Sequence, residues 1–179
     1  MKQSKTSNEI LSLPTWAFFW IILSSFIVMW DIGFVLNRPR SLPGGDLHFI
    51  WQPYSKYITI DYVYRDIDNE FGIAQSWMNI VEVALLYVGL LLYRSARAAS
   101  LLSFLVSLLF TFSKTVLYAL VETAANNANV AHNDWNTFIF LYILPNYCWI
   151  VFPGILSITI LRKLHRVLST ALSDKKKNE

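Results

Sequence analysis

Four long apolar runs, separated by polar connections, dominate the hydrophobic pattern of this 179-residue chain. They cover about residues 15–36, 73–93, 98–121 and 138–161. Each run is long enough for the roughly 20 residues that a helix needs to cross the hydrocarbon core of a bilayer. The connection between the second and third runs, RSARA, is so short that those helices must be antiparallel neighbours. The pattern therefore predicts an all-α membrane protein, a bundle of four transmembrane helices.

The polar connections assign the remaining residues to the ends of one domain. Residues 1–14 are expected to form an N-terminal segment, 15–168 the four-helix domain and 169–179 a basic tail. The long connection between the first two runs opens with NRPRSLPGG, whose prolines and glycines exclude a continuous helix. Its continuation, LHFIWQPYSKYITIDYVY, mixes aromatic and polar residues. This mixture predicts an interfacial or re-entrant lid between the first and second helices.

Composition agrees with this assignment and adds an orientation. The chain is 55% hydrophobic, with a mean hydropathy of +0.41, which is too apolar for an ordinary soluble domain. If four helices alternate, one side carries more basic residues than the other. That side has Lys2, Lys5, Arg94, Arg97, Arg162, Lys163, Arg166 and Lys175 to Lys177, and the opposite side has Arg38, Arg40, Lys56 and Arg65. The positive-inside rule then predicts that both termini are cytosolic and that the lid is lumenal. The basic tail is accordingly interpreted as a topology signal that is compatible with lipid contact, rather than as a nucleic-acid interface.

The C-terminus and the single cysteine restrict compartment and chemistry. The last four residues, KKNE, match the dilysine pattern for retrieval to the endoplasmic reticulum, which requires a cytosolic tail. A solvated lysine-rich end is the alternative, but the charge distribution favours retrieval and a multi-pass protein of that membrane. Cys148 stands alone, so an internal disulfide and a cysteine-based zinc site are excluded. We expect neither a metal nor a cofactor.

Each predicted helix carries a polar residue at a similar depth. Asp31, Lys114, Glu82 and Asn146 lie roughly five to nine residues inside the same end of their helices. An ionisable side chain in hydrocarbon costs at least ~2.5 kcal/mol, so a common level favours a shared function. Further polar residues recur every three or four positions and predict one interior cavity open to the lumenal side. The three stripes are Ser103, Ser107, Thr111, Lys114, Tyr118 and Glu122; Tyr142, Asn146, Trp149 and Pro153; and Gln75, Asn79 and Glu82.

The charges within this cavity suggest acid–base chemistry. Asp31 and Glu82 share one deep cation, Lys114, so a carboxyl group without the ammonium is expected to keep its proton near neutral pH. Such an acid can protonate a weak base such as an alkene or an epoxide. The indole of Trp149 would stabilise a developing carbocation by about 0.5 to 2 kcal/mol. Alternatively, these residues form a buried ion network that fixes helix packing, with Asn146 hydrogen-bonding between helices.

Three motifs resemble those of the EXPERA domain, the four-helix membrane module of the emopamil-binding protein family. They are NYCWIVFPG at 146–154, IWQPYSKYITIDYVY at 50–64 and VLYALVE at 116–122. The resemblance spans about residues 16–168. It implies that Asp31 and Glu82 handle the proton, that Asn146 and Trp149 line the substrate pocket, and that Asp61 and Tyr64 belong to the lid.

Two departures from the family bear on the reaction. Ile27 stands where the family has its catalytic histidine, and SKT at 113–115 replaces a Tyr-x-Asp sequence. They weigh against a standard sterol double-bond shift, and the sequence leaves open either an alkene isomerisation or an acid-triggered rearrangement such as the epoxide opening attributed to related fungal-type members of the family. The family comparison offers a sterol, a terpenoid or a prenylated alkaloid as substrate. A lysine that the family lacks would suit an oxygenated substrate.

These observations predict a membrane-embedded, cofactor-free isomerase with Asp31 as the catalytic acid and Glu82 as its partner base, or the reverse. Substrate-binding residues are expected to be Lys114, Tyr118, Glu122, Asn146, Trp149, Asp61 and Tyr64. The alternative is a non-catalytic sterol-binding or trafficking protein similar to the sigma-two receptor of the same family. A channel is disfavoured because the polar stripes stop about halfway across the bilayer. The family includes dimers, so a homodimer is a further possibility that the sequence leaves open.

Overall fold

The computed structural model describes residues 7–178, which are helical or irregular and contain no strand. Lys2 and Lys5, and the terminal Glu179 of the dilysine pattern, lie outside the described residues. Four helical segments are long and apolar enough to cross a membrane: α2, α5, α6 and a continuous helical run from Trp135 to Lys176. The prediction of an all-α protein with four candidate membrane spans is thus confirmed. The elements are α1 (Ser7–Ile10), α2 (Thr15–Leu36), η1 (His48–Ile50), α3 (Tyr54–Tyr57), α4 (Tyr62–Arg65), α5 (Glu70–Leu92), α6 (Arg97–Ala124), α7 (Trp135–Thr137), η2 (Phe138–Ile143) and α8 (Leu144–Asn178).

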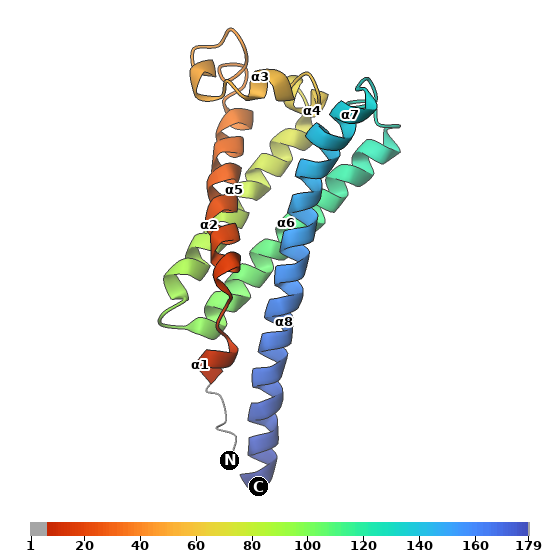
Figure 1. Cartoon of the computed structure of the whole chain (residues 1–179). Coiled ribbons are helices and arrows are strands. Elements are labelled where there is room, and N and C mark those ends of the chain that lie inside the picture. The colour runs from red at the N-terminus through yellow and green to blue at the C-terminus, as the bar shows by residue number, and fades with distance from the viewer. Residues whose placement is uncertain (1–6, 179) are drawn as a thin grey trace.

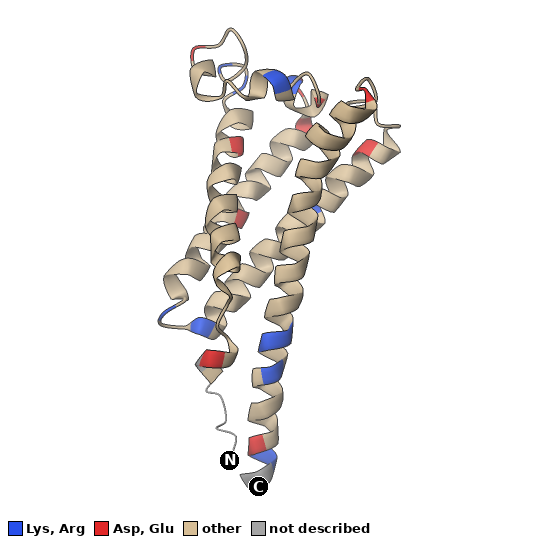
Figure 2. Ribbon diagram, viewed as in Figure 1, with Lys and Arg blue, Asp and Glu red and all other residues tan. Residues whose placement is uncertain are grey.

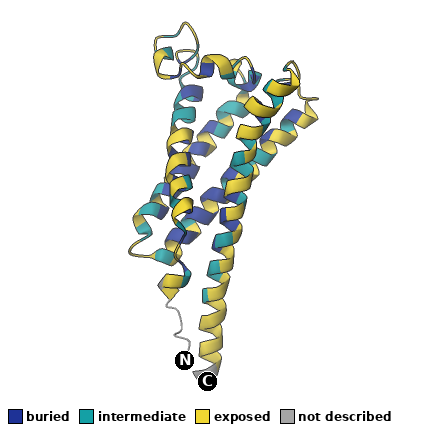
Figure 3. Cartoon of the chain, viewed as in Figure 1, coloured by how far each residue is buried: buried dark blue, intermediate teal, exposed yellow. Residues whose placement is uncertain are grey.

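The long helices pack in a chain of neighbours, α2 on α5, α5 on α6 and α6 on α8 (Figure 1). The short turn between α5 and α6 makes them antiparallel, as the sequence predicts. The first and last described residues lie at the same end of the bundle, opposite the segment that joins α2 to α5. Charged residues gather towards the two ends, and a few acidic and basic positions lie along the helices (Figure 2). The outward faces of the helices are largely exposed and apolar, as lipid contact requires (Figure 3).

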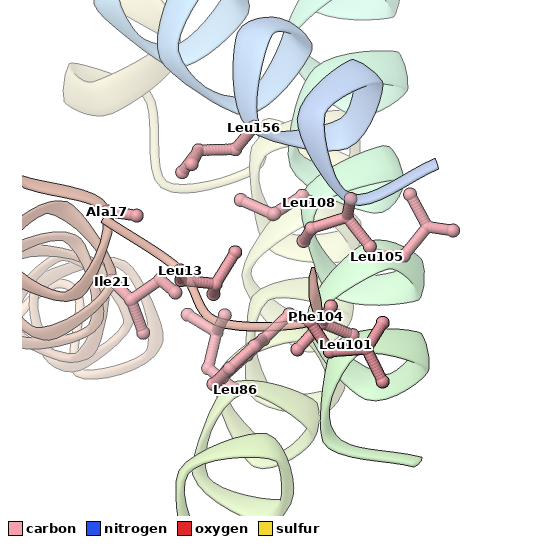
Figure 4. Packing of buried hydrophobic residues seen from close by; sticks show 11 residues of the cluster. Leu13, Ala17, Ile21, Leu86, Leu101, Phe104, Leu105, Leu108 and Leu156 are labelled. Carbon is pink, nitrogen blue, oxygen red and sulfur yellow. The ribbon is translucent and has the colours of Figure 1, made fainter. Parts of the chain in front are cut away.

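An apolar core closes the end of the bundle that carries the termini (Figure 4). Leu13 and Ala17 from the start of the chain pack there against residues of α5, α6 and α8. The α5–α6 contact is close because Gly89 lies against the ring of Phe104, with no room for a side chain. The cluster comprises Leu11, Leu13, Ala17, Ile21, Leu86, Leu101, Phe104, Leu105, Leu108, Leu156 and Ile160.

A ladder of serines on α6 ties this helix to the backbone of α5. Ser100 donates a hydrogen bond to the carbonyl of Gly89 at 2.6 Å, and Ser103 to that of Leu85 at 2.7 Å. Ser107 donates to the carbonyl of Glu82 at 2.9 Å. Small hydroxyl residues permit close helix approach and bond between helices where water is absent. The ladder therefore fixes the register that places the next turns of α6 opposite Glu82.

The fourth helical run changes its winding just before a proline. Residues 138–143 form a π-helix, and Pro145 follows in the first turn of α8. Proline has no N–H group, and its ring would clash with the carbonyl four residues earlier in a regular α-helix. The wider turn removes this conflict, and the side-chain amide of Asn146 donates to the carbonyl of Tyr142 at 2.8 Å. Pro145 and Asn146 are thereby held at a fixed point of the helix.

Residues 37–69, here called the connecting segment, fold over the other end of the bundle. The guanidinium of Arg38 binds the carbonyls of Val63, Tyr64 and Asp66 at 2.9, 3.1 and 3.0 Å. The indole N–H of Trp51 donates to the carbonyl of Trp30 at 2.8 Å. These bonds attach both halves of the segment to the end of α2. They also set the aromatic side chains of the segment above the interior of the bundle.

Candidate functional site

One large cavity lies between the helices beneath the connecting segment, with a volume of about 380 Å³. This volume is within the range of small-molecule sites in proteins. All four long helices and the connecting segment contribute to its wall. The lining residues are Ile27, Val28, Trp30, Asp31, Pro53, Tyr54, Tyr57, Tyr64, Gln75, Asn79, Glu82, Thr111, Lys114, Thr115, Tyr118, Pro145, Asn146 and Trp149.

The deep wall of this cavity carries an ion pair between α5 and α6. The ammonium nitrogen of Lys114 lies 2.9 Å from Oε2 of Glu82. The Glu82 side chain is 2% exposed and that of Lys114 is 15% exposed, so water screens the pair only weakly. The serine ladder positions both residues, since Ser107, about two helical turns before Lys114 on α6, bonds the backbone carbonyl of Glu82.

Asp31 lines the cavity from α2 and pairs with hydroxyl groups instead. The hydroxyl of Tyr54 donates to Oδ1 of Asp31 at 2.5 Å, and Tyr64 provides a second hydroxyl to the same carboxyl group. Among residues 7–178, no lysine or arginine lies within ion-pair distance of Asp31. The two acids that share the cavity therefore have different partners, an ammonium for Glu82 and phenols for Asp31.

Aromatic residues of the connecting segment form the roof over Asp31. The ring of Tyr54 stacks on Phe34 with centroids 4.0 Å apart, and Tyr57 meets Tyr64 edge to face at 4.9 Å. Burial is the main cause that raises the pKa of the Tyr54, Tyr57 and Tyr64 hydroxyls well above their ordinary value. All three phenols therefore keep their protons at neutral pH, and the hydroxyls of Tyr54 and Tyr64 donate to Asp31.

The wall formed by α8 consists of Pro145 and residues that follow it in the helix. Asn146 and Trp149 line the cavity, and the side chain of Asn146 hydrogen-bonds to Tyr57 of the roof. The ring of Trp149 lies 5.4 Å from that of Trp20, which in turn stacks on Phe152 at 4.4 Å. These indoles fill the space between α2 and α8 below the cavity. The ring of Trp149 thus forms part of both the wall and the floor.

Seven of the nine site residues expected from the sequence line this cavity, and Asp61 and Glu122 do not. Asp61 is fully buried behind it, where it accepts hydrogen bonds from the hydroxyl of Tyr118 and the backbone N–H of Val63. Glu122 accepts from the side-chain amide of Asn129 at 2.6 Å and so holds the loop after α6. The expected stripe of α6 is thus too long at both ends, because Ser103 and Ser107 bond the backbone of α5 and Glu122 binds the loop after α6. Ser103, Ser107, Tyr142 and Pro153 also lie outside the lining.

Two lining tyrosines, Tyr54 and Tyr57, were not among the expected site residues. Their signal in the sequence is the aromatic–polar mixture of the connecting segment, which predicts a lid without saying which rings turn inward. The structure selects them because α3 presents Tyr54 to α2 and Tyr57 to α8. The hydroxyl groups that bond to Asp31 therefore come from the connecting segment, where helical periodicity gives no guide to which side chains point inward.

Comparison of the chain with protein-family models, curated proteins and solved structures finds no match. The class of protein is therefore defined by its fold and cavity alone. It is a multi-pass helical membrane protein with an interior site that is apolar in most of its wall and carries an ion pair, an acid and several phenols. Among residues 7–178, no three His, Cys, Asp or Glu side chains are grouped so that they could hold a metal ion.

Proposed function

We propose that the protein is a membrane-embedded isomerase that protonates a hydrophobic substrate with a carboxylic acid and then removes a neighbouring proton. The observation that carries this proposal is the separation of two acids in one cavity. Glu82 is held by Lys114 at 2.9 Å, whereas Asp31 faces the same space without a cation within ion-pair distance in the described part of the chain. Acids with different environments are suited to different proton-transfer roles.

The proposed roles follow from these surroundings. Asp31 is the acid, because a carboxyl group that lacks an ammonium partner in an apolar pocket favours the protonated form. Glu82 is the base, because it is paired with Lys114, whose ammonium also offers a hydrogen bond to an oxygen atom of the substrate. Trp149 and the tyrosine rings line the cavity and present π faces that stabilise positive charge on carbon. No cofactor enters this scheme.

The substrate class that we propose is a sterol, a terpenoid or a prenylated alkaloid. A cavity of about 380 Å³ accommodates a polycyclic or prenylated carbon skeleton, and the exposed apolar helix faces give it access to lipid-dissolved compounds. The polar wall of Lys114, Asn79 and Thr111 suits a substrate that carries oxygen. An epoxide or alkene rearrangement meets both requirements.

We further propose that the chain belongs with the EXPERA-domain proteins and resides in the endoplasmic reticulum membrane. Support comes from Asp31, Glu82, Asn146 and Trp149, the residues that the family resemblance selects, because all four line one cavity. The connecting segment would then be a lumenal lid and both termini cytosolic. The basic residues near the shared end of the chain termini support that orientation.

A non-catalytic binding protein is the second candidate, and one contact favours it. The Tyr54 hydroxyl donates to Asp31 at 2.5 Å, which stabilises an ionised carboxylate suited to binding rather than to proton donation. Such a protein would hold a sterol-like ligand and release it unchanged. A homodimer is compatible with either candidate.

Deuterium incorporation distinguishes the two candidates even when the product has the same mass as the substrate. Microsomes that contain the protein are incubated with sterol and terpenoid extracts in deuterated water, and the lipids are analysed by chromatography and mass spectrometry. An isomerase yields a product with a new retention time, which carries one deuterium on carbon if an alkene is protonated and none if the oxygen of an epoxide is protonated. We expect Asp31→Asn to abolish this product, and Asp68→Asn, which alters an exposed acid of the connecting segment, to retain it. Full product formation by Asp31→Asn would overturn the assignment of the acid.

A further inference from the structure

A second, much smaller cavity adjoins the first on the side of α5. Its volume is about 20 Å³, and a site needs roughly 10–15 Å³ to hold a water molecule. It shares part of its wall with the large cavity, including Asp31, Tyr64, Asn79 and Tyr118. The residues that line only the small cavity are Val35, Val63, Gly72 and Ser76.

Two polar side chains in its wall have no protein partner within residues 7–178. Ser76 is 1% exposed and Asn79 is 8% exposed, and neither side chain forms a hydrogen bond to another described residue. Buried polar groups in native proteins are almost always hydrogen-bonded to protein or to ordered water. A space of this size beside a hydroxyl and an amide is therefore a site for one water molecule.

The neighbours of the small cavity connect the two buried aspartates. Asp31 and Tyr118 both line the small cavity. The hydroxyl of Tyr118 also donates a hydrogen bond to Asp61, which is fully buried and lines neither cavity. Burial raises the pKa of Asp61 to about 6, despite the hydrogen bond from Tyr118 that acts in the opposite direction. Asp61 can therefore exchange a proton near neutral pH.

We propose that a water molecule in the small cavity, bound by Ser76 and Asn79, forms with Tyr118 a proton relay between Asp31 and Asp61. In one passage the O–H bond of Asp31 breaks and its proton binds the water. A proton of that water moves to the Tyr118 oxygen, and the Tyr118 proton binds the Asp61 carboxylate. Water and tyrosine end with as many protons as before, and the reverse passage restores the acid form of Asp31.

The relay gives Asp61 and Tyr118 a role outside substrate contact. Its catalytic use rests on the proposed function, because an acid that donates its proton to carbon must be protonated again before the next turnover. Asp61 acts as a proton reservoir, and Tyr118 is a positioning and transfer residue that reaches it. The water site itself depends only on the geometry of the small cavity.

Infrared spectroscopy of the purified chain in phosphatidylcholine nanodiscs tests the relay without a substrate. The carbonyl stretch of a protonated carboxyl group shifts when its hydrogen is replaced by deuterium, and the band lost in Asp31→Asn identifies Asp31. After transfer to deuterated water, we expect the Asp31 band of Tyr118→Phe to shift about tenfold more slowly than in the wild type. Tyr142→Phe is the matched control, since it removes a buried hydroxyl of the same aromatic cluster but leaves the bond to Asp61.

Ser76→Val fills the small cavity without touching the large one and serves as a second variant if Tyr118→Phe fails to fold. It should slow the exchange similarly, and a high-resolution structure should show the water in the wild type but not in this variant. Equal exchange rates in all variants would overturn the relay and leave the proposed isomerase intact. A wild type without an Asp31 band would overturn both, since there would be no proton to pass. A functioning relay without turnover would overturn the isomerase alone.

Discussion

Lys114 pairs with Glu82 across the α5–α6 contact at 2.9 Å, and leaves Asp31 on α2 to the tyrosines of the connecting segment. The choice of partner follows from the packing of α5 on α6, where the serine ladder holds the two backbones together. This pairing determines which acid is neutralised by an ammonium and which is not.

Lys114→Met should destabilise the protein by about 3–5 kcal/mol, because it leaves the carboxylate of Glu82 buried without a counter-charge. The double variant Glu82→Gln with Lys114→Met should recover most of this loss, since neither remaining side chain is charged. The stabilities of the wild type, the two single variants and the double variant are compared by unfolding in detergent, monitored by tryptophan fluorescence. Equal destabilisation by the single and double variants would show that the pair contributes through packing rather than charge.

The stability of the fold should depend on the protonation of Asp61. Its pKa is raised from 3.8 to about 6 in the folded protein, mainly by burial. Below pH 4 the group is protonated in both states, and as pH rises through 6 the folded protein must release a proton from a buried site. The free energy of unfolding should therefore fall between about pH 4 and pH 6, by roughly 3 kcal/mol at most.

The substitution Asp61→Asn isolates this effect, because it removes the titrating group and keeps a polar side chain beside Tyr118. The change in thermal midpoint between pH 4.5 and pH 7 should be smaller in this variant than in the wild type. Parallel pH profiles of the two proteins would contradict the assignment of a raised pKa to Asp61.

Gly89→Ala should be destabilising because an added Cβ would lie 2.4 Å from the ring of Phe104. Overpacking of this kind costs typically 1–3 kcal/mol. Gly154→Ala is the matched control on α8, where the nearest atom, on Phe112, would lie 3.5 Å away in ordinary contact. Thermal unfolding should show a lower midpoint for the first variant, and an equal or higher midpoint for the second because alanine favours helix. Similar midpoints for both variants would mean that α5 and α6 are not so closely packed.

Arg38→Met should loosen the connecting segment, because the Arg38 guanidinium binds the carbonyls of Val63, Tyr64 and Asp66 together. If the free energy of local opening falls by about 1.4 kcal/mol, the population of the open segment rises tenfold, and limited proteolysis of the segment measures that population. Arg40→Met is the control, since its ion pair with Asp46 is exposed and contributes little. Unchanged cleavage of Arg38→Met would show that other contacts suffice to hold the segment.

The sequence predicts the spans and much of the cavity wall because both depend on local periodicity. Asp31, Glu82, Lys114 and Asn146 lie at a common depth, and depth can be counted along each run without knowledge of the partner helix. The choice between Asp31 and Glu82 as partner of Lys114 could not be predicted, because it depends on how each helix is rotated. The serine ladder fixes that rotation through backbone carbonyls, which carry no signal in the sequence.

The ends of the polar stripes were harder to assign for a related reason. Glu122 continues the stripe of α6 by spacing, but it binds Asn129 in the loop that follows. Asp61 lies outside the cavity lining because it is the N-cap residue of α4, and its side chain accepts a hydrogen bond from the N–H of Val63. Both outcomes depend on how loops return to the bundle. Periodicity within a helix does not describe such contacts.

The length of the last helix has a consequence on the side of the bilayer where the chain ends. If the hydrocarbon core ends near Leu161, the helix continues to residue 176 as a rigid stalk of roughly 20 Å. A protein that recognises the basic residues Lys175 and Lys176 would then meet them at a fixed height above the lipid headgroups, rather than on a tether that bends to the surface. Shortening the stalk by whole turns would lower that height in steps of about 5.4 Å and leave the membrane domain unchanged.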